Sequence, residues 1–180
     1  MVLAFLVIGD TGTIGRQALA RQSGLGDGAI RTVLKKLKEA GYLEVNASGG
    51  SLTGAGRRLY ARTRERITGP ILLERSLLTV GNRQAAVAVR GAALLIHDGI
   101  LQRDSAIKIG ASGATTYIIK GSKFTVPRGS VDCEKDFPSP TWKKFRLEFH
   151  PEDSDVLIIS GSDDNMKSKL GALTAALTLA

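Results

Sequence analysis

Hydrophobic side chains recur at helical spacing in one segment of the first third of the chain, residues 27–40. With successive residues placed 100° apart, the apolar ones share one face of a helix: Ile30, Val33, Leu34, Leu37 and Ala40. Asp27 stands at the N-cap position and Gly41 directly follows the segment. The pattern therefore predicts an amphipathic helix over residues 27–40 with one buried face and one polar face.

The flanking segments predict a compact arrangement of helices around a hairpin. The four residues Ser23–Gly26 break the chain before the amphipathic helix. Thr53 is placed to cap a later helix, whose residues Leu59, Tyr60 and Ile67 we expect to point inward. The run 2–8 is too short for its periodicity to separate helix from strand. The expected order is a turn at 9–15, a helix at 16–22, strands at 42–45 and 51–53 around a turn at 46–50, and a helix at 54–67.

Thr68-Gly69-Pro70 is the clearest domain boundary, because the sequence pattern beyond it changes to that of strands and mixed elements. We assign 128–142 as irregular and leave 143–149 unassigned. The expected elements are strands at 71–79, 84–90, 114–120, 123–127 and 155–160, and helices at about 99–110 and 163–179. The predicted fold class is α+β, with a first domain over residues 1–69 and a mixed α+β domain over residues 70–180.

Charge is distributed unevenly between these two parts. The chain of 180 residues has a net charge of +8, and residues 1–69 hold 11 basic against 5 acidic side chains. Residues 70–180 hold 14 basic and 12 acidic side chains, so a polyanionic partner is expected for the first part. No apolar run is long enough for a membrane helix, the first residues lack the features of a signal peptide, and there is a single cysteine. We expect a cytoplasmic protein that makes no membrane contact.

Two helices joined by a short Gly-containing turn, the second one basic, are typical of a DNA-reading helix-turn-helix. Ala20 allows the two helices to approach, and Gly24 can take the positive φ of the turn. The segments IGRQALARQSGLGDGAIRTVLKKLKEAGYLEV and SLTGAGRRLY make residues 13–67 resemble a winged helix-turn-helix domain of prokaryotic transcriptional regulators. The resemblance implies that residues 27–40 form the recognition helix in the major groove of double-stranded DNA and that residues 46–51 form the wing tip.

The wing segment NASGGS contains no Lys or Arg, so its phosphate contacts are expected only from the backbone or Asn46. The arginines of residues 57–66 fit either a phosphate clamp or a solvated helix face. The candidate DNA-binding residues are Arg16, Asp27, Gly28, Arg31, Thr32, Lys35, Lys36, Lys38, Asn46, Arg57 and Arg58.

The segments RDSAIKIGASGATTYIIKGSKF and IISGSDDNMKSKLGALTAAL resemble an uncharacterised C-terminal domain that follows winged helices in some archaeal proteins. We expect this domain to act as a sensor, a dimerisation module or both. Small residues and hydroxyls between a helix and a strand fit a small anionic effector. The candidate effector-binding residues are Arg103, Lys108, Ser112, Thr115, Thr116 and Ser162.

A homodimer is expected, because one recognition helix covers few base pairs and two-fold dimers bind paired half-sites. Residues of the final helix recur at 4-3-4-3 spacing and form either a dimer seam or a stripe that packs within one chain. These residues are Met166, Leu170, Leu173, Leu177 and Ala180.

Two alternatives from other classes remain open. Gly9, Gly12 and Gly15 have the spacing of a nucleotide-binding loop, which needs a strand before it and a second strand about 20 residues on. Such a loop would make the chain a nucleotide-dependent enzyme. The other alternative is a winged helix that binds only proteins. Either would replace the preferred function, a sequence-specific transcriptional regulator.

Metal and nucleophile chemistry is poorly supported. His97, His150 and Cys133 lack ligand-like spacing. Cys133 stands between Asp132 and Glu134, and these charges should raise the pKa of its thiol. The acidic residues 153, 155, 163 and 164 fit a helix N-terminus better than a hard-cation site. We therefore expect no catalytic residue, no metal, no cofactor and no enzyme activity.

Overall fold

The computed structural model describes residues 1–179 and divides the chain into two compact units, Met1–Arg64 and Glu65–Ala180. Both units mix helices and strands, which confirms the α+β class. The expected boundary at residues 68–70 lies inside a strand of the second unit, β4 (Ile67–Leu73).

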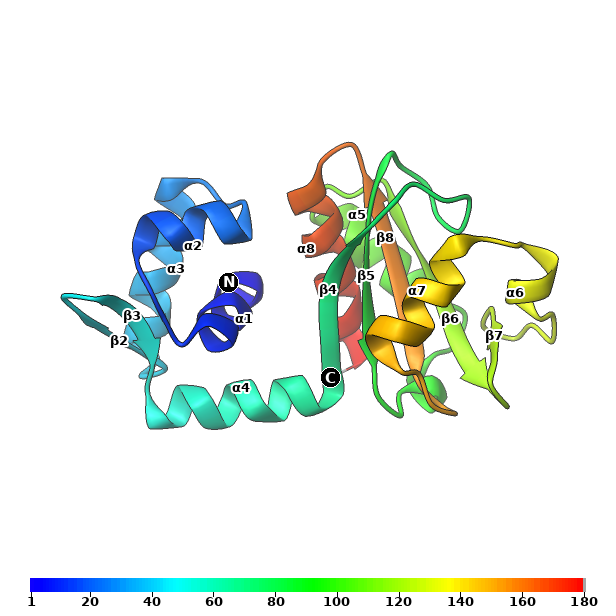
Figure 1. Ribbon diagram of the computed structural model, residues 1–180, viewed down its shortest axis with the longest axis horizontal. Helices are drawn as coiled ribbons and strands as arrows, with labels where there is room; N and C mark the ends of the chain where they lie inside the picture. Colours follow the sequence, from blue (N-terminus) through cyan, green and yellow to red (C-terminus); the bar gives the residue numbers. More distant parts are fainter. Residues whose placement is uncertain (180) are drawn as a thin grey trace. The chain divides into compact units, whose positions relative to one another are not determined.

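The first unit places helices around a small sheet of strand order β1-β3-β2, in which both pairs are antiparallel. The two central helices and the hairpin are at the positions that the sequence predicts (Figure 1). Its elements are α1 (Val2–Thr11), β1 (Thr13–Ile14), α2 (Arg16–Ser23), α3 (Asp27–Glu39), β2 (Leu43–Asn46), β3 (Gly49–Leu52) and α4 (Gly54–Arg66), the last of which ends just beyond the unit.

The apolar run at the start of the chain is the helix α1, which continues through Gly9 to Thr11. The expected turn at residues 9–15 is therefore wrong for its first three positions. Gly9 packs directly against an aromatic ring, since a Cβ there would lie 2.1 Å from Tyr60 Cδ2. This contact, and not the approach of a phosphate, explains the glycine. The nucleotide-binding alternative is contradicted, because a helix stands where that loop needs a strand.

Helix α4 begins as expected but buries a different face. The Gly56 N–H donates to Thr53 Oγ1 at 3.1 Å, so Thr53 is the predicted cap. Leu59 is 39% exposed and Tyr60 is half-buried, so the expected inward stripe is wrong. Ile67 is buried, but as the first residue of β4. At Gly56 the helix approaches the backbone directly, since a Cβ there would lie 2.2 Å from the Tyr42 carbonyl oxygen.

The second unit is an antiparallel five-stranded sheet of order β4-β5-β8-β6-β7 with helices on both faces. Gly171 of α8 lies against one face, where a Cβ would be 2.3 Å from Ser160 Oγ, and α5 packs beside α8. Helix α7 lies on the opposite face (Figure 1). The elements are β5 (Arg83–Val89), η1 (Ala93–Leu95), α5 (Ile100–Lys108), β6 (Gly113–Lys120), β7 (Lys123–Thr125), α6 (Cys133–Asp136), α7 (Pro140–Phe149), β8 (Val156–Ser162), α8 (Asn165–Ala176) and η2 (Leu177–Leu179).

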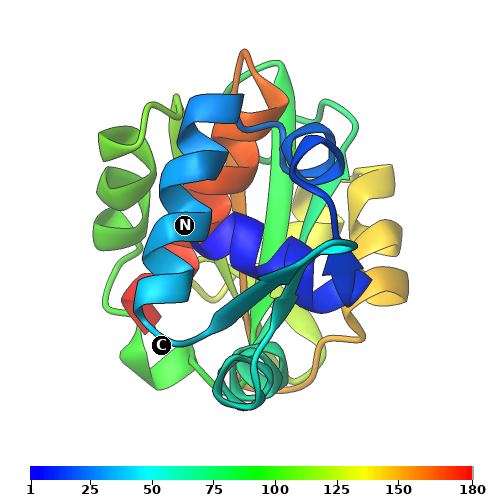
Figure 2. The same cartoon turned by 90° about the vertical axis from the view of Figure 1, so that its left-hand side faces the viewer.

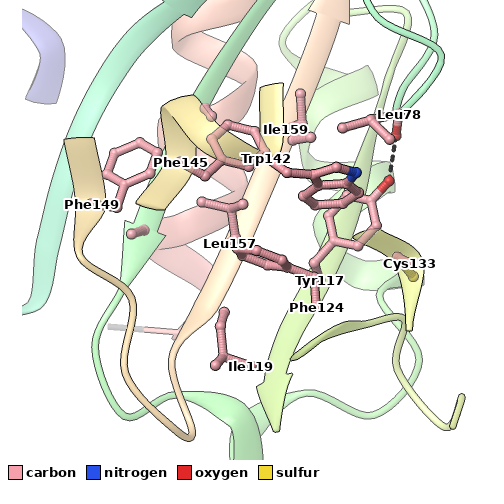
Figure 3. Packing of buried hydrophobic residues seen from close by; sticks show 12 residues of the cluster. Leu78, Tyr117, Ile119, Phe124, Cys133, Trp142, Phe145, Phe149, Leu157 and Ile159 are labelled. Carbon is pink, nitrogen blue, oxygen red and sulfur yellow. Dashed lines mark hydrogen bonds between the residues drawn. The ribbon is translucent and has the colours of Figure 1, made fainter. Parts of the chain in front are cut away.

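An aromatic core fills the face under α7. Trp142 stacks on Phe124 with ring centroids 4.8 Å apart and meets Tyr117 edge to face (Figure 3). Phe145 and Phe149 extend the same helix face over the sheet. The sequence left this region irregular or unassigned because Pro140 reads as a helix breaker, whereas proline fits the first turn of a helix.

Several other elements differ from expectation. Strand β4 ends at Leu73, so most of the expected strand 71–79 is loop. The final α-helix ends at Ala176 and tightens into η2. Its buried positions are small residues and one leucine: Ser168, Gly171, Ala172, Leu173, Ala175 and Ala176. Of the expected seam, Leu173 is buried, Met166 and Leu170 are half-buried, Leu177 is 40% exposed, and Ala180 lies outside the described residues.

Within residues 1–179, no helix combines the length and apolarity needed to cross a membrane.

Candidate nucleic-acid interface

The turn between α2 and α3 is built by local hydrogen bonds. Gly24 has a φ of 74°, the left-handed conformation predicted for it, and its N–H donates to the Ala20 carbonyl at 2.9 Å. The buried Ser23 hydroxyl donates to the Leu19 carbonyl at 2.7 Å and accepts from the Leu25 N–H at 3.3 Å. The turn between the two helices is therefore held by backbone groups and the buried Ser23 side chain, and by no polar side chain of α3.

Helix α3 has one buried face and one exposed face, largely as its periodicity predicts. Ile30, Val33 and Leu37 are buried, Leu34 is half-buried, and Ala40, which was expected inside, is exposed. The polar side chains on the other side are all exposed: Arg31, Thr32, Lys35, Lys36 and Lys38. Figure 2 looks onto the first unit and shows α3 beside the β2–β3 hairpin. The exposed positions are therefore free for a partner, while the buried ones fix the helix.

Asp27 has a different role from the cap that the sequence predicts. Gly26 is the N-cap residue, and no side chain caps the helix. The Asp27 carboxylate instead binds two arginines, Arg16 at 3.1 Å and Arg31 at 2.8 Å. These ion pairs are about half exposed, so their individual stabilisation is small. Their consequence is geometric, because one carboxylate orients two guanidinium groups on the same surface.

The remaining α3 side chains differ in how freely they present their charge. Lys35 lies 3.8 Å from Glu39 in an exposed pair one turn away. Burial, followed by the Lys36 charge, lowers the pKa of the Met1 amino group, so the Lys36 charge is close enough to the start of the chain to repel that group. The Thr32 hydroxyl donates to the Gly28 carbonyl at 3.1 Å, so only its lone pairs remain for a partner. Lys38 has no ion pair within residues 1–179.

The wing is a tight hairpin held by its own side chain. Asn46 pairs with Gly49 across the turn, so the tip is only residues 47–48 and not 46–51. The Asn46 side-chain oxygen accepts from the Ser48 N–H at 3.0 Å and the Gly49 N–H at 3.2 Å. Gly49 has a φ of 135°, and a Cβ there would lie 2.5 Å from the Ile14 carbonyl oxygen. Asn46 thus keeps only its side-chain NH₂ for an external contact.

The arginines of α4 are mostly committed within the protein. Arg57 donates to the Leu52 carbonyl at 2.8 Å, and Arg66 to the Leu179 carbonyl at 3.3 Å. Arg64 and Tyr60 both bind the Asp10 carboxylate at 2.5 Å. Burial and the bond to Asp10 raise the pKa of the Tyr60 hydroxyl.

Arg58 and Arg62 are exposed, and neither has a hydrogen-bond or ion-pair partner in the described part of the chain. A cation absent from the sequence-based set, Arg21, lines a groove between α2, α3 and β2 together with Arg16. Only the fold could reveal Arg21, because it lies on α2 and belongs to no periodic basic stripe.

The predicted effector residues fall into separate groups. Arg103, Thr115 and Thr116 line one cavity of about 210 Å³. Ser112 and Ser162 lie outside that cavity, just before β6 and at the end of β8, where the Ser112 N–H donates to the Gly161 carbonyl at 2.8 Å. The Ser162 hydroxyl accepts from the Asp164 N–H at 3.2 Å, and Lys108 is exposed at the end of α5. The structure therefore joins three of the six residues.

The four acidic residues that the sequence assigned to a helix N-terminus have structural partners. Asp164 caps α8 by accepting from the Lys167 N–H at 2.9 Å, as the sequence predicts for this helix start. The buried Asp155 carboxylate binds Arg90 at 2.6 Å and accepts from the Gly91 N–H at 2.9 Å. Asp153 accepts from the Gly121 N–H, and Asp163 from the Asn82 amide. Residues 1–179 contain no cluster of three or more His, Cys, Asp or Glu side chains suited to a metal ion.

Cys133 is buried in the aromatic core. The pKa of its thiol is raised, as expected, but the largest cause is burial. The charges of Asp132 and Asp136 contribute less, and Glu134 is not among the causes.

These features define a winged helix-turn-helix unit followed by an antiparallel α+β unit. A family model described as Domain of unknown function (DUF4443) matches residues 80–179, more than half of the chain. The chain belongs to this family. The expectation of an uncharacterised second domain is thereby confirmed, and the match lies entirely within the second unit.

Solved structures that are similar to the chain include the following two. Hypothetical protein PH0730 from Pyrococcus horikoshii OT3 is 24% identical, with a TM-score of 0.77, over 99% of this chain and 92% of that one. This likeness shows the fold of the whole chain. A MarR family protein, Rv2887 of Mycobacterium tuberculosis, is 27% identical over 35% of this chain and 48% of that one, with a TM-score of 0.33. No curated protein matches the chain.

Proposed function

We propose that the protein is a sequence-specific DNA-binding transcriptional regulator that reads the major groove with α3. The observation that carries the proposal is the exposed polar face of α3, with four cations and Thr32, on the second helix of a helix-turn-helix. The major groove is wide enough for one helix, and its base edges are read by side chains that project from that helix.

The charges around α3 support this docking. Arg31 can donate to a base edge through two N–H groups, and its ion pair to Asp27 orients it without burying it. Lys35 and Lys38 are placed to contact phosphates along the groove. Arg16 begins α2 and Arg21 lies in its last turn; both line the groove beside α3 and add phosphate contacts there.

The wing contributes less than α3 does. It carries no basic side chain, and the Asn46 oxygen is occupied by the turn. Its contact to DNA is limited to backbone N–H groups and the Asn46 NH₂. Arg58 is the α4 residue that completes the phosphate contacts, since Arg57 is already bound to the Leu52 carbonyl.

The second unit serves as the dimerisation and sensing module in this proposal. A single recognition helix reads only a few base pairs, so two copies on neighbouring half-sites about 10 bp apart supply the specificity. Light scattering of the free protein and of its DNA complex should give the mass of two chains. The mass of one chain in both states would contradict the dimer but not DNA binding.

The test begins with selection of bound fragments from random or genomic DNA, followed by titration at several salt concentrations. The Lys35→Ala/Lys38→Ala variant should lose about two units of salt slope and bind all sites more weakly. Its matched control is Lys120→Ala/Lys123→Ala, which removes the same charge from exposed positions of the second unit. Equal affinity of both variants and the wild type would contradict the proposal. Selection of no DNA would favour the protein-binding winged helix instead.

A further inference from the structure

A small cavity lies at the start of α5, within the second unit. Its volume is about 210 Å³, which is below the range of drug-sized ligand pockets and suits a compact molecule. One wall is apolar, formed by Ile100, Ala114, Val126 and Pro127. The other side is polar and contains Asp98, Arg103, Thr116 and the backbone of Thr115.

The floor of this cavity contains an unsatisfied polar group. Thr116 is 4% exposed, and its Oγ1 atom has no hydrogen-bond partner among the described residues. A buried hydroxyl without a partner costs free energy and is uncommon in folded proteins. The neighbouring Thr115 hydroxyl, by contrast, is bound to Thr79 Oγ1 at 3.1 Å. The Thr116 hydroxyl is therefore the group that a bound molecule would satisfy.

Gly99 keeps space open beside that hydroxyl. It has a φ of 82°, and a Cβ there would lie 3.4 Å from Thr116 Oγ1 and 3.6 Å from Pro127 Cγ. Any side chain would enter the gap between the floor and the apolar wall. The glycine thus serves both the left-handed backbone before α5 and the opening of the cavity.

The charges at the rim select the sign and the number of charges on a ligand. The Arg103 guanidinium has five N–H donors, and its exposed pair with Asp104 at 2.9 Å leaves several of them free. The start of α5 adds partial positive charge, which favours an anion. Asp98, which accepts from the Ile100 N–H at 2.9 Å, adds one negative charge at the start of the same helix. A dianion would be repelled by Asp98, whereas a single carboxylate can bind Arg103.

We infer that this cavity binds a small monocarboxylic acid with a short apolar chain. Its carboxylate accepts hydrogen bonds from Arg103 and Thr116, and its hydrocarbon part contacts Ile100, Val126 and Pro127. The inference concerns the second unit alone and does not depend on DNA binding. Lys108, Ser112 and Ser162 have no part in this site.

The binding test uses the full chain and three probes at matched ionic strength: sodium butyrate, its neutral analogue butyramide, and inorganic phosphate. Butyrate should raise the melting temperature by a few degrees in a saturable manner. Butyramide and phosphate should have little effect. Calorimetric titration should show about tenfold weaker butyrate binding for Thr116→Val and for Arg103→Gln. An Ala114→Leu variant, which fills the cavity, should not bind.

A second measurement examines the free protein. Thr116→Val should leave the melting temperature unchanged or raise it, because it removes an unsatisfied buried hydroxyl. The matched control is Thr125→Val, which removes a buried hydroxyl that donates to the Ile118 carbonyl at 3.2 Å and should lower it. The inference is overturned if butyrate produces no saturable shift, if phosphate or butyramide binds equally well, or if Thr116→Val destabilises the protein as much as Thr125→Val does.

Discussion

Helices α3 and α4 have the same length and similar numbers of cations, yet their charges have different partners. In α4, Arg57, Arg64 and Arg66 reach the Leu52 carbonyl, the Asp10 carboxylate and the Leu179 carbonyl. In α3, the ion pairs join side chains on the protein surface, as in the 3.8 Å pair between Lys35 and Glu39. The cations of α4 mainly hold the fold, and those of α3 remain available to a partner.

The comparison shows that a count of basic residues does not give the charge offered to DNA. An arginine that binds a backbone carbonyl or a carboxylate from a distant segment must break that contact before it binds a phosphate. An exposed pair one helical turn away has little to lose, since such pairs contribute only a few tenths of a kcal/mol. The two helices should therefore respond oppositely to the same substitution.

The largest effect is expected for Arg31→Ala on DNA affinity. Loss of a bidentate hydrogen bond to a base should cost about 1–3 kcal/mol of binding free energy at the preferred site and less at unrelated sites. The free energy of unfolding should change by no more than about 0.5 kcal/mol, because the side chain is exposed. Binding titrations on selected and scrambled DNA measure the first quantity, and urea unfolding measures the second. Uniform weakening at all sites would reassign Arg31 to a phosphate.

The converse effect is expected for Arg64→Ala. It removes a partner of Asp10 and should lower the free energy of unfolding by about 1–2 kcal/mol. DNA affinity should stay within twofold of the wild type. Arg62→Ala is the matched control, since Arg62 is on the same helix and has no partner within residues 1–179. Equal stability of the two variants in urea would remove the distinction between α3 and α4.

A smaller effect should separate two neighbouring lysines of α3. Lys35 projects from the exposed face, whereas Lys36 lies toward the amino end of α1. Lys35→Ala should reduce the salt slope of DNA binding by about one, the value for a single phosphate contact. Lys36→Ala should reduce it less. A salt titration of both single variants measures the difference, and the reverse order would show that α3 docks with its α1 side toward the DNA.

The smallest effect is expected for Asp27→Asn, and it is an increase in affinity. The substitution removes one negative charge beside Arg16 and Arg31, so both can turn toward phosphates. We expect binding to tighten by about threefold at low salt and the gain to disappear at high salt. Weaker binding would show that Asp27 orients the two arginines for recognition and that its charge matters less than its geometry.

Much of the first unit could be predicted from the sequence because its signals are local. The 3.6-residue period placed Ile30, Val33 and Leu37 inside, and Gly24 supplied the left-handed turn before α3. These features depend on neighbours within a few residues. The exposed basic face of α3 follows from the same period, so the main part of the candidate interface was accessible without a structure.

Contacts between distant segments decided the rest. Nothing near Gly9 in the sequence indicates that Tyr60 packs against it, and so the glycine spacing resembled a nucleotide loop. The final helix, α8, is rich in small residues and packs on the sheet because Gly171 lies directly against Ser160 of β8. Likewise, Thr115 and Thr116 are adjacent in sequence, but strand alternation sends them to opposite faces of the sheet. Sequence periodicity determined which side chains of α3 face the solvent, whereas only tertiary packing decided which cations are already bound and which hydroxyl is left without a partner.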